Sequence, residues 1–130
     1  MKLVSAILAQ NEADRYLKRV VRRCLEFSDA VLVLDDHSTD STAQLALEMG
    51  CQVRSRGGSE AWGNESPARA ELWDWATQEA GPDGWILVCD ADQILKGDPR
   101  SLTLSWEVNS WAMPLFDLWT EDGKYYRQDG

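Results

Sequence analysis

Three short stretches of almost uninterrupted apolar residues constrain the fold of this chain more than any other feature. They lie at residues 3–9 (LVSAILA), 30–34 (AVLVL) and 85–89 (WILVC). Continuous apolar runs of four to eight residues are typical of strands that are buried on both faces, as in a parallel sheet. We therefore expect these runs to form the buried strands of a mainly parallel sheet.

The segments between these runs have the spacing and the end signals of helices. Helices are expected over residues 14–27, 39–49 and 66–80, with Pro67 at the first position of the third and Gly81-Pro82 after its end. A short strand is expected at residues 51–54. Because strands and helices alternate, the pattern predicts the α/β class, with helices flanking a mainly parallel sheet. The core positions predicted for the first helix are Leu17, Val20, Val21, Cys24 and Leu25.

The pattern changes after Pro99. A helical turn is expected at residues 100–105, followed by strands at residues 111–119 and 124–127. The turn between these strands would be Glu121-Asp122-Gly123.

Length and composition favour one globular domain over residues 1–130. Apolar residues make up 44% and charged residues 27%, which disfavours a disordered chain or a fibrous repeat. The three cysteines, Cys24, Cys51 and Cys89, have no CxxC spacing, which indicates buried thiols in a reducing compartment and predicts a cytoplasmic protein. The N-terminus has no signal-peptide pattern, and no apolar stretch is long enough for a membrane span.

The net charge of −9 limits the possible partners. Basic and acidic side chains balance within residues 1–56, so residues 57–130 carry the whole excess. A duplex nucleic-acid binder needs a basic face, and the charge disfavours that class. Anionic ligands remain possible, because a bound divalent cation can invert the local field.

Polar residues follow each of the three apolar runs. Parallel strands would bring these residues to one edge of the sheet, where ligands of open α/β folds bind. The carboxylates gathered there would be Glu12, Asp35, Asp36, Asp90 and Asp92. Such a cluster favours a hard cation such as Mg²⁺ or Mn²⁺. The alternative for Asp35, Asp36 and Asp40 is that they form a turn and cap the helix that follows.

Four motifs resemble the family 2 glycosyltransferases of the GT-A fold. They are Gln10-Asn11-Glu12, the segment DDHSTD at residues 35–40, SPARA at residues 66–70, and WILVCDAD at residues 85–92. In this order they extend over residues 3 to about 95, and together they are specific, although each alone is weak. The resemblance implies a Rossmann-like GT-A sheet in a truncated or minimal form.

The resemblance also implies a donor site for a nucleotide sugar, a UDP- or GDP-sugar, with Mn²⁺ or Mg²⁺. Glu12, its neighbours Gln10 and Asn11, and the backbone near Ala9 would lie against the nucleoside. Asp36 and Asp35 would read the base or ribose, and Arg69 would lie near the phosphates or base. Asp90, with Ala91 beside it, would contact the ribose or sugar. Asp92 would hold the metal, supported by Asp90.

Two departures from the family pattern stand out. His37 replaces the glycine that is commonest in the DDHSTD motif, and a turn residue is the expected role for this histidine. The chain also ends at Gly130, whereas family members usually continue and take acceptor contacts and the general base from that continuation. The late carboxylates match no family motif; they are Asp117, Glu121, Asp122 and Asp129. A fragment of a longer protein, or a reduced protein that oligomerises, would explain this.

The expected activity is transfer of a sugar from the nucleotide diphosphate to an acceptor hydroxyl, with inversion at the anomeric carbon. Three alternatives remain. A nucleotide-sugar-binding module would bind without turnover. A receiver-like signalling domain would have a phosphoacceptor carboxylate after its first strand and a late-strand lysine, and neither Lys96 nor Lys124 fits that position. A sugar nucleotidylyltransferase would have a glycine-rich loop, but residues 8–16 lack glycine.

Overall fold

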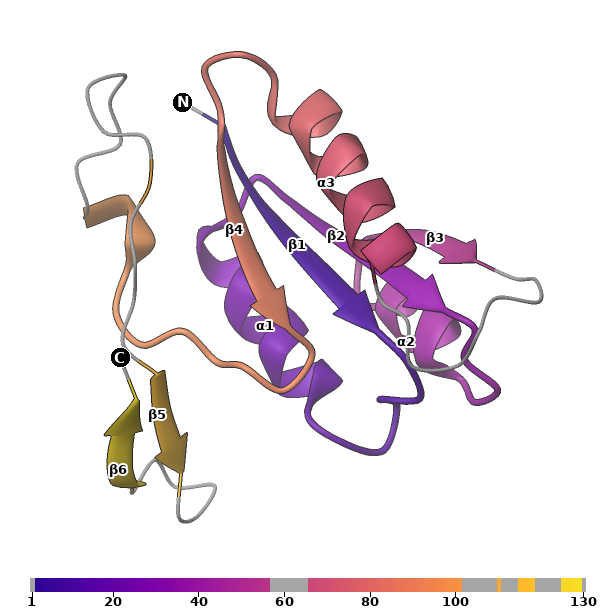
Figure 1. Ribbon diagram of the computed structural model, residues 1–130, viewed down its shortest axis with the longest axis horizontal. Coiled ribbons are helices and arrows are strands. Elements are labelled where there is room, and N and C mark those ends of the chain that lie inside the picture. The colour runs from indigo at the N-terminus through magenta and orange to yellow at the C-terminus, as the bar shows by residue number, and fades with distance from the viewer. Residues whose placement is uncertain (1, 57–65, 102–109, 111–114, 119–124, 130) are drawn as a thin grey trace.

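The computed structural model describes residues 2–56, 66–101, 110, 115–118 and 125–129. Its main sheet has four parallel strands in the order β3-β2-β1-β4 (Figure 1). The strands are β1 (Leu3–Ala9), β2 (Ala30–Asp36), β3 (Gln52–Arg56) and β4 (Trp85–Asp90). All three apolar runs are therefore parallel strands, as the sequence predicts.

Three helices cover the two faces of this sheet. They are α1 (Leu17–Phe27), α2 (Thr42–Glu48) and α3 (Ser66–Ala80). In Figure 1, α3 lies in front of the sheet, and α1 and α2 lie behind it. The result is the three-layer α/β arrangement predicted from the alternation of elements.

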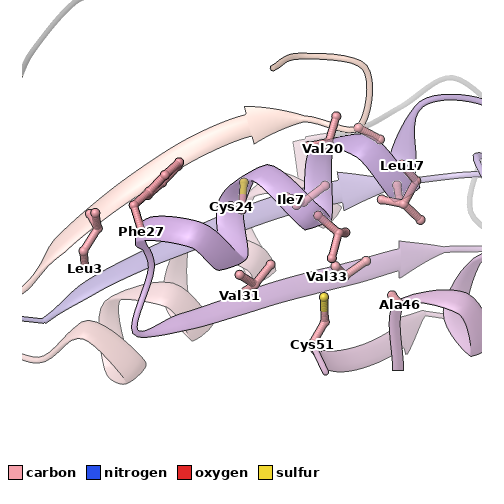
Figure 2. Packing of buried hydrophobic residues seen from close by; sticks show 13 residues of the cluster. Leu3, Ile7, Leu17, Val20, Cys24, Phe27, Val31, Val33, Ala46 and Cys51 are labelled. Carbon is pink, nitrogen blue, oxygen red and sulfur yellow. The ribbon is translucent and has the colours of Figure 1, made fainter. Parts of the chain in front are cut away.

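Side-chain alternation along the strands produces two separate cores. Val31 and Val33 pack on the side of α1 and α2, whereas Leu32 and Leu34 pack on the side of α3. Figure 2 shows the first of these cores, with Val20 and Cys24 of α1 beside Ile7 of β1. Burial on both faces explains why these strands read as continuous apolar runs.

The strand order reverses at β1. The chain passes from β1 to β2 and β3 on one side, and the connection through α3 then places β4 on the other side of β1. Ligands of open α/β folds bind at this kind of switch point, outside the carboxyl ends of the strands. The carboxyl ends of β1 and β4 therefore mark the region where a site is expected.

Helix boundaries and one core residue differ from the sequence prediction. α1 begins at Leu17 and not at residue 14, and α2 begins at Thr42 and not at residue 39, because the preceding residues form hydrogen-bonded loops. Leu25, predicted in the core, is 40% exposed, and Phe27 is buried instead. α3 has the predicted bounds.

The C-terminal region contains a short helical turn, η1 (Pro99–Ser101), and two antiparallel strands, β5 (Leu115–Leu118) and β6 (Tyr125–Asp129). They confirm the two strands expected after Pro99: β5 lies within the predicted range 111–119, and β6 begins and ends later than the predicted 124–127. The predicted turn residues Glu121 and Asp122 and the tryptophans Trp111 and Trp119 lie outside the described residues. None of the helices in the described ranges is long and apolar enough to cross a membrane.

Candidate functional site

The polar residues that follow the apolar runs lie at one edge of the sheet, as predicted. The strand register pairs Ala9 of β1 with Asp35 of β2, and Leu8 of β1 with Asp90 of β4. The carboxyl ends of β1, β2 and β4 therefore lie side by side at one edge of the sheet. The last residues of these strands and the loops after them carry every site residue that the sequence singled out except Arg69, which lies in the first turn of α3.

The loop after β1 is bound to the loop after β2. The backbone N–H of Asn11 donates to the Ser38 hydroxyl at 2.9 Å, and the Asn11 side-chain oxygen accepts from the backbone N–H of Thr39 at 2.8 Å. Asn11 and His37 have φ angles of 52° and 62°, in the left-handed region that asparagine tolerates better than most residues. The side chain of Asn11 therefore fixes the loop, while Gln10 beside it is exposed.

The carboxylate of Asp40 also connects these two loops through hydrogen bonds. It accepts hydrogen bonds from the backbone N–H of Thr42 at 2.9 Å and of Ala13 at 3.3 Å, and from the Thr42 hydroxyl. The Thr42 hydroxyl in turn accepts from the backbone N–H of Glu12 at 2.9 Å. Hydrogen bonding, led by that from Thr42, lowers the pKa of Asp40. The alternative is thus correct for Asp40 as far as the turn is concerned, whereas the N-cap position of α2 belongs to Ser41.

Asp36 is held in an ion-pair chain on the α3 side. Its Oδ1 lies 3.2 Å from Nη1 of Arg56 in β3 and 2.5 Å from Nδ1 of His37. Nε of Arg56 lies 2.6 Å from Oε2 of Glu71 in α3. The chain connects β2, β3 and α3, and it positions the Asp36 carboxylate at the carboxyl edge.

Asp35 occupies the opposite face, because neighbouring strand residues alternate. It is only 6% exposed, and its Oδ1 is buried without a hydrogen-bond partner among the described residues. A buried acceptor without a donor costs free energy, so Oδ1 is available to a donor from a ligand or water. Asp35 and Asp36 thus reach the edge on different sides of the sheet.

Arg69 and Asp90 meet beside the switch point. Nη2 of Arg69 lies 3.5 Å from Oδ1 of Asp90, and both side chains are 47% exposed. The turn after β4 is closed by Gln93, whose side-chain oxygen accepts from the Asp90 backbone N–H at 2.9 Å. Within this turn Ala91 is buried and Asp92 is exposed. Ala91 anchors the turn, and both carboxylates remain open to solvent.

Glu12 links the end of β1 to the turn after β4 electrostatically. Its carboxylate lies 3.4 Å from Nε of Arg15. Burial raises the pKa of Glu12, Arg15 opposes this, and the charges of Asp92 and Asp40 add to it. The repulsion from Asp92 indicates that the carboxylates after β1 and β4 share one electrostatic environment.

The carboxylates fit a magnesium-type ion only if a ligand completes the coordination. Among the described residues, no group of three or more His, Cys, Asp or Glu side chains is arranged to hold a metal. Mg²⁺ is commonly bound by one or two carboxylates together with water and substrate phosphates. Asp90 and Asp92, two solvent-accessible carboxylates of one turn, fit that mode.

Sequence reasoning missed the residues that position the site. Arg56, Thr42 and Gln93 each bind a candidate residue or its loop, and Glu71 binds Arg56; all of these contacts except the local one from Gln93 join separate elements. Only the strand register, which pairs Asp36 with Arg56, could have indicated one of them in advance.

Comparison with known proteins identifies the family. The family model described as glycosyl transferase family 2 matches residues 6–100. A comparison with curated proteins returned no significant match. The match begins within β1 and includes β2, β3, the three helices, β4 and the turn after it. The four-stranded parallel sheet with three helices is consistent with a GT-A core. The chain therefore belongs to glycosyl transferase family 2.

Proposed function

We propose that this chain transfers a sugar from a UDP- or GDP-sugar to an acceptor hydroxyl, with inversion at the anomeric carbon and with Mn²⁺ or Mg²⁺ bound. Family membership implies a glycosyltransferase and a nucleotide-sugar donor. The observation that carries the finer proposal is the contact between Arg69 in the first turn of α3 and Asp90 at the end of β4. A cation and a carboxylate adjoin there, at the switch point where α/β folds bind ligands.

The donor diphosphate would lie between the first turn of α3 and the turn after β4. The N-terminus of a helix attracts anions through its unpaired N–H groups, and Arg69 adds a guanidinium suited to phosphate. Asp90 would contact the ribose or sugar alongside Ala91, and Asp92, supported by Asp90, would hold the metal. When bound, the ion would supply Lewis-acid stabilisation of charge that develops on the departing diphosphate.

The nucleoside would lie over the carboxyl ends of β1 and β2. The backbone at Ala9 and the loop Gln10-Asn11-Glu12 would form one wall. Asp36, held by Arg56, and Asp35, whose Oδ1 has no hydrogen-bond partner within the described part of the chain, would accept hydrogen bonds from the base or ribose. Nucleobases and ribose hydroxyls both carry the donors that such carboxylates need.

The charge of the site supports metal dependence. Five carboxylates belong to the candidate site, and the donor adds the negative charge of a diphosphate. Without a cation, repulsion between these groups would oppose binding. Inversion requires a single displacement by the acceptor hydroxyl, which a carboxylate base would deprotonate. That base is not assigned, because no carboxylate of this chain matches the family's later motif.

Thermal unfolding tests the donor site. UDP and GDP would each be added with and without Mn²⁺ to the wild type, to Asp92→Asn and to Asp83→Asn. Asp83 is an exposed carboxylate in the turn between α3 and β4, at the opposite edge of the sheet, so Asp83→Asn is the matched control. A ligand at one hundred times its Kd adds about 2.7 kcal/mol of stability, which raises Tm by several degrees.

We expect one nucleotide to raise Tm only with Mn²⁺, in the wild type and in Asp83→Asn but not in Asp92→Asn. Absence of any shift in a folded wild type would contradict the donor site. A shift without sugar transfer to any acceptor would instead assign the chain to the binding-module alternative.

A further inference from the structure

The sulfur atoms of Cys24 and Cys89 lie 3.9 Å apart, although 65 residues separate them in sequence. Cys24 projects from α1 into the core beside Ile7 (Figure 2), and Cys89 packs against the same core from β4. All three cysteines of the chain are free thiols. An S–S bond is about 2.05 Å long, so the two sulfurs need to approach by about 1.9 Å.

The contact between the two thiols changes the acidity of Cys24. The hydrogen bond with Cys89 lowers the pKa of Cys24. The third cysteine differs, because burial raises the pKa of Cys51 to about 11. Since the thiolate is the form that reacts with oxidants, the lowered pKa favours Cys24 as the thiol that is oxidised first.

The strand that carries Cys89 is held on one side only by the described strands. Among the described strands only β1 pairs with β4, so β4 lies at the edge of the sheet (Figure 1). Cys89 is half-buried, which gives a small oxidant a route to the pair. The following residue, Asp90, faces the other side of the sheet and contacts Arg69 of α3. A pull on Cys89 toward α1 therefore draws Asp90 away from Arg69.

We propose that Cys24 and Cys89 form a reversible disulfide in the folded protein when it meets a hydroperoxide, and that this disulfide weakens the donor site by separating Asp90 from Arg69. The second part rests on the proposed function, and the first part does not.

The chemistry balances in two steps. The Cys24 thiolate attacks the peroxide, so that an S–O bond forms, the O–O bond breaks, and the leaving alkoxide or hydroxide takes up a proton. The Cys89 sulfur then attacks the resulting sulfenic acid; the S–S bond forms, the S–O bond breaks, and water leaves with the Cys89 proton. Two thiols are oxidised and one peroxide is reduced. A dithiol reductant reverses the linkage by exchange.

Mass spectrometry decides whether the disulfide forms. Folded, reduced protein is treated with hydrogen peroxide, denatured with an alkylating agent and digested. We expect a linked pair of peptides joined through Cys24 and Cys89 that has lost two hydrogen atoms and is released by dithiothreitol, with Cys51 alkylated. Cys51→Ser should form the same link, and Cys89→Ser should not. Recovery of Cys24 and Cys89 as separate peptides, or a link that needs Cys51, would overturn the proposal.

Nucleotide binding decides the regulatory part. The Mn²⁺-dependent shift with UDP or GDP is measured before and after peroxide treatment. We expect the apparent Kd of the oxidised wild type to be about tenfold weaker, the size of one charge-assisted contact, and that of peroxide-treated Cys89→Ser to be unchanged. An equal Kd for linked and reduced protein would refute the regulation. A reduced protein that binds no nucleotide would contradict the proposed function. The peptide masses would still show whether the disulfide between Cys24 and Cys89 forms.

Discussion

Arg56 in β3 holds Asp36 in β2 across the last register pair of these strands, with 3.2 Å between Nη1 and Oδ1. The two side chains are only 13% and 14% exposed. The same guanidinium reaches Glu71 of α3 through Nε. A mostly buried carboxylate at the candidate site thus has its position set by two other elements.

Replacement of Arg56 by methionine should destabilise the fold and disturb the site. Asp36 would lose its main counter-charge while it remains mostly buried, so we expect a loss of about 1–3 kcal/mol in the free energy of unfolding. Urea denaturation of Arg56→Met, Asp36→Asn and the double variant measures the coupling. The double variant should lose less than the sum of the two single losses. Arg22→Met, at an exposed position on α1, should change stability by no more than about 0.5 kcal/mol. If the loss in the double variant equals the sum of the two single losses, the interaction between Arg56 and Asp36 contributes nothing to stability.

Thr42→Val should loosen the connection between the first two loops. Thr42 is fully buried, and its hydroxyl accepts from the Glu12 N–H and donates to Asp40. Valine keeps the shape but leaves the Glu12 N–H without its acceptor, while Asp40 keeps its two backbone donors, so the variant should lose about 1–3 kcal/mol in urea denaturation. The matched control is Thr77→Val, because Thr77 is exposed and its hydroxyl bonds only a helical carbonyl, at 2.7 Å. Equal losses in the two variants would argue against the loop connection.

Glu12→Gln should stabilise the protein at neutral pH and not at low pH. The folded state raises the pKa of Glu12 above its ordinary 4.5, chiefly through burial. The contribution of Glu12 is therefore favourable below pH 4.5 and is lost as the pH rises through the raised pKa. Glutamine does not titrate, so the difference in unfolding free energy between variant and wild type should grow from pH 4 toward pH 7. A difference that is flat with pH would disprove this assignment.

The contribution of Asp29 to stability should depend on pH in the opposite direction to that of Glu12, so Asp29→Asn serves as the comparison for Glu12→Gln. The Asp29 carboxylate accepts from the backbone N–H of Leu3 at 2.8 Å and from Arg100 at 2.7 Å, and these bonds lower its pKa from the ordinary 3.8. Its stabilising contribution is present above pH 3.8 and is lost as the pH falls through the lowered pKa. Asp29→Asn should therefore be less stable than wild type at neutral pH, with the gap closing in acid.

Arg69→Ala should weaken nucleotide binding without unfolding the domain. The side chain is 47% exposed, so the free energy of unfolding should change by no more than about 0.5 kcal/mol. Loss of a charged phosphate contact should raise the Kd of the Mn²⁺–nucleotide complex about tenfold or more, measured by calorimetry. Arg22→Ala removes the same charge from exposed α1 and should leave the Kd unchanged. A Kd for Arg69→Ala equal to that of Arg22→Ala would remove Arg69 from the site.

Local patterns in the sequence were sufficient for the layers of the fold. The apolar runs at residues 3–9, 30–34 and 85–89 are strands, and Pro67 and Gly81 mark the start and end of α3. The predicted start of α2 at residue 39 was wrong. The side-chain oxygen of Asn11, which is distant in sequence, accepts from the Thr39 N–H and holds residue 39 in the loop. Family membership also favours the glycosyltransferase prediction over the receiver-like and nucleotidylyltransferase alternatives.

By itself, the sequence determined that the polar residues after three strands share one edge, because parallel strands necessarily end on the same side. Only the tertiary structure decided how those residues are used. The pleat turns Asp35 and Asp36 to opposite faces, Asp40 connects two loops, and Asp36 and Asp90 are paired with arginines. Hydrogen bonds and ion pairs depend on distances between elements that no local pattern encodes. The same reason explains why the contact between Cys24 and Cys89 becomes visible only when α1 packs against β4.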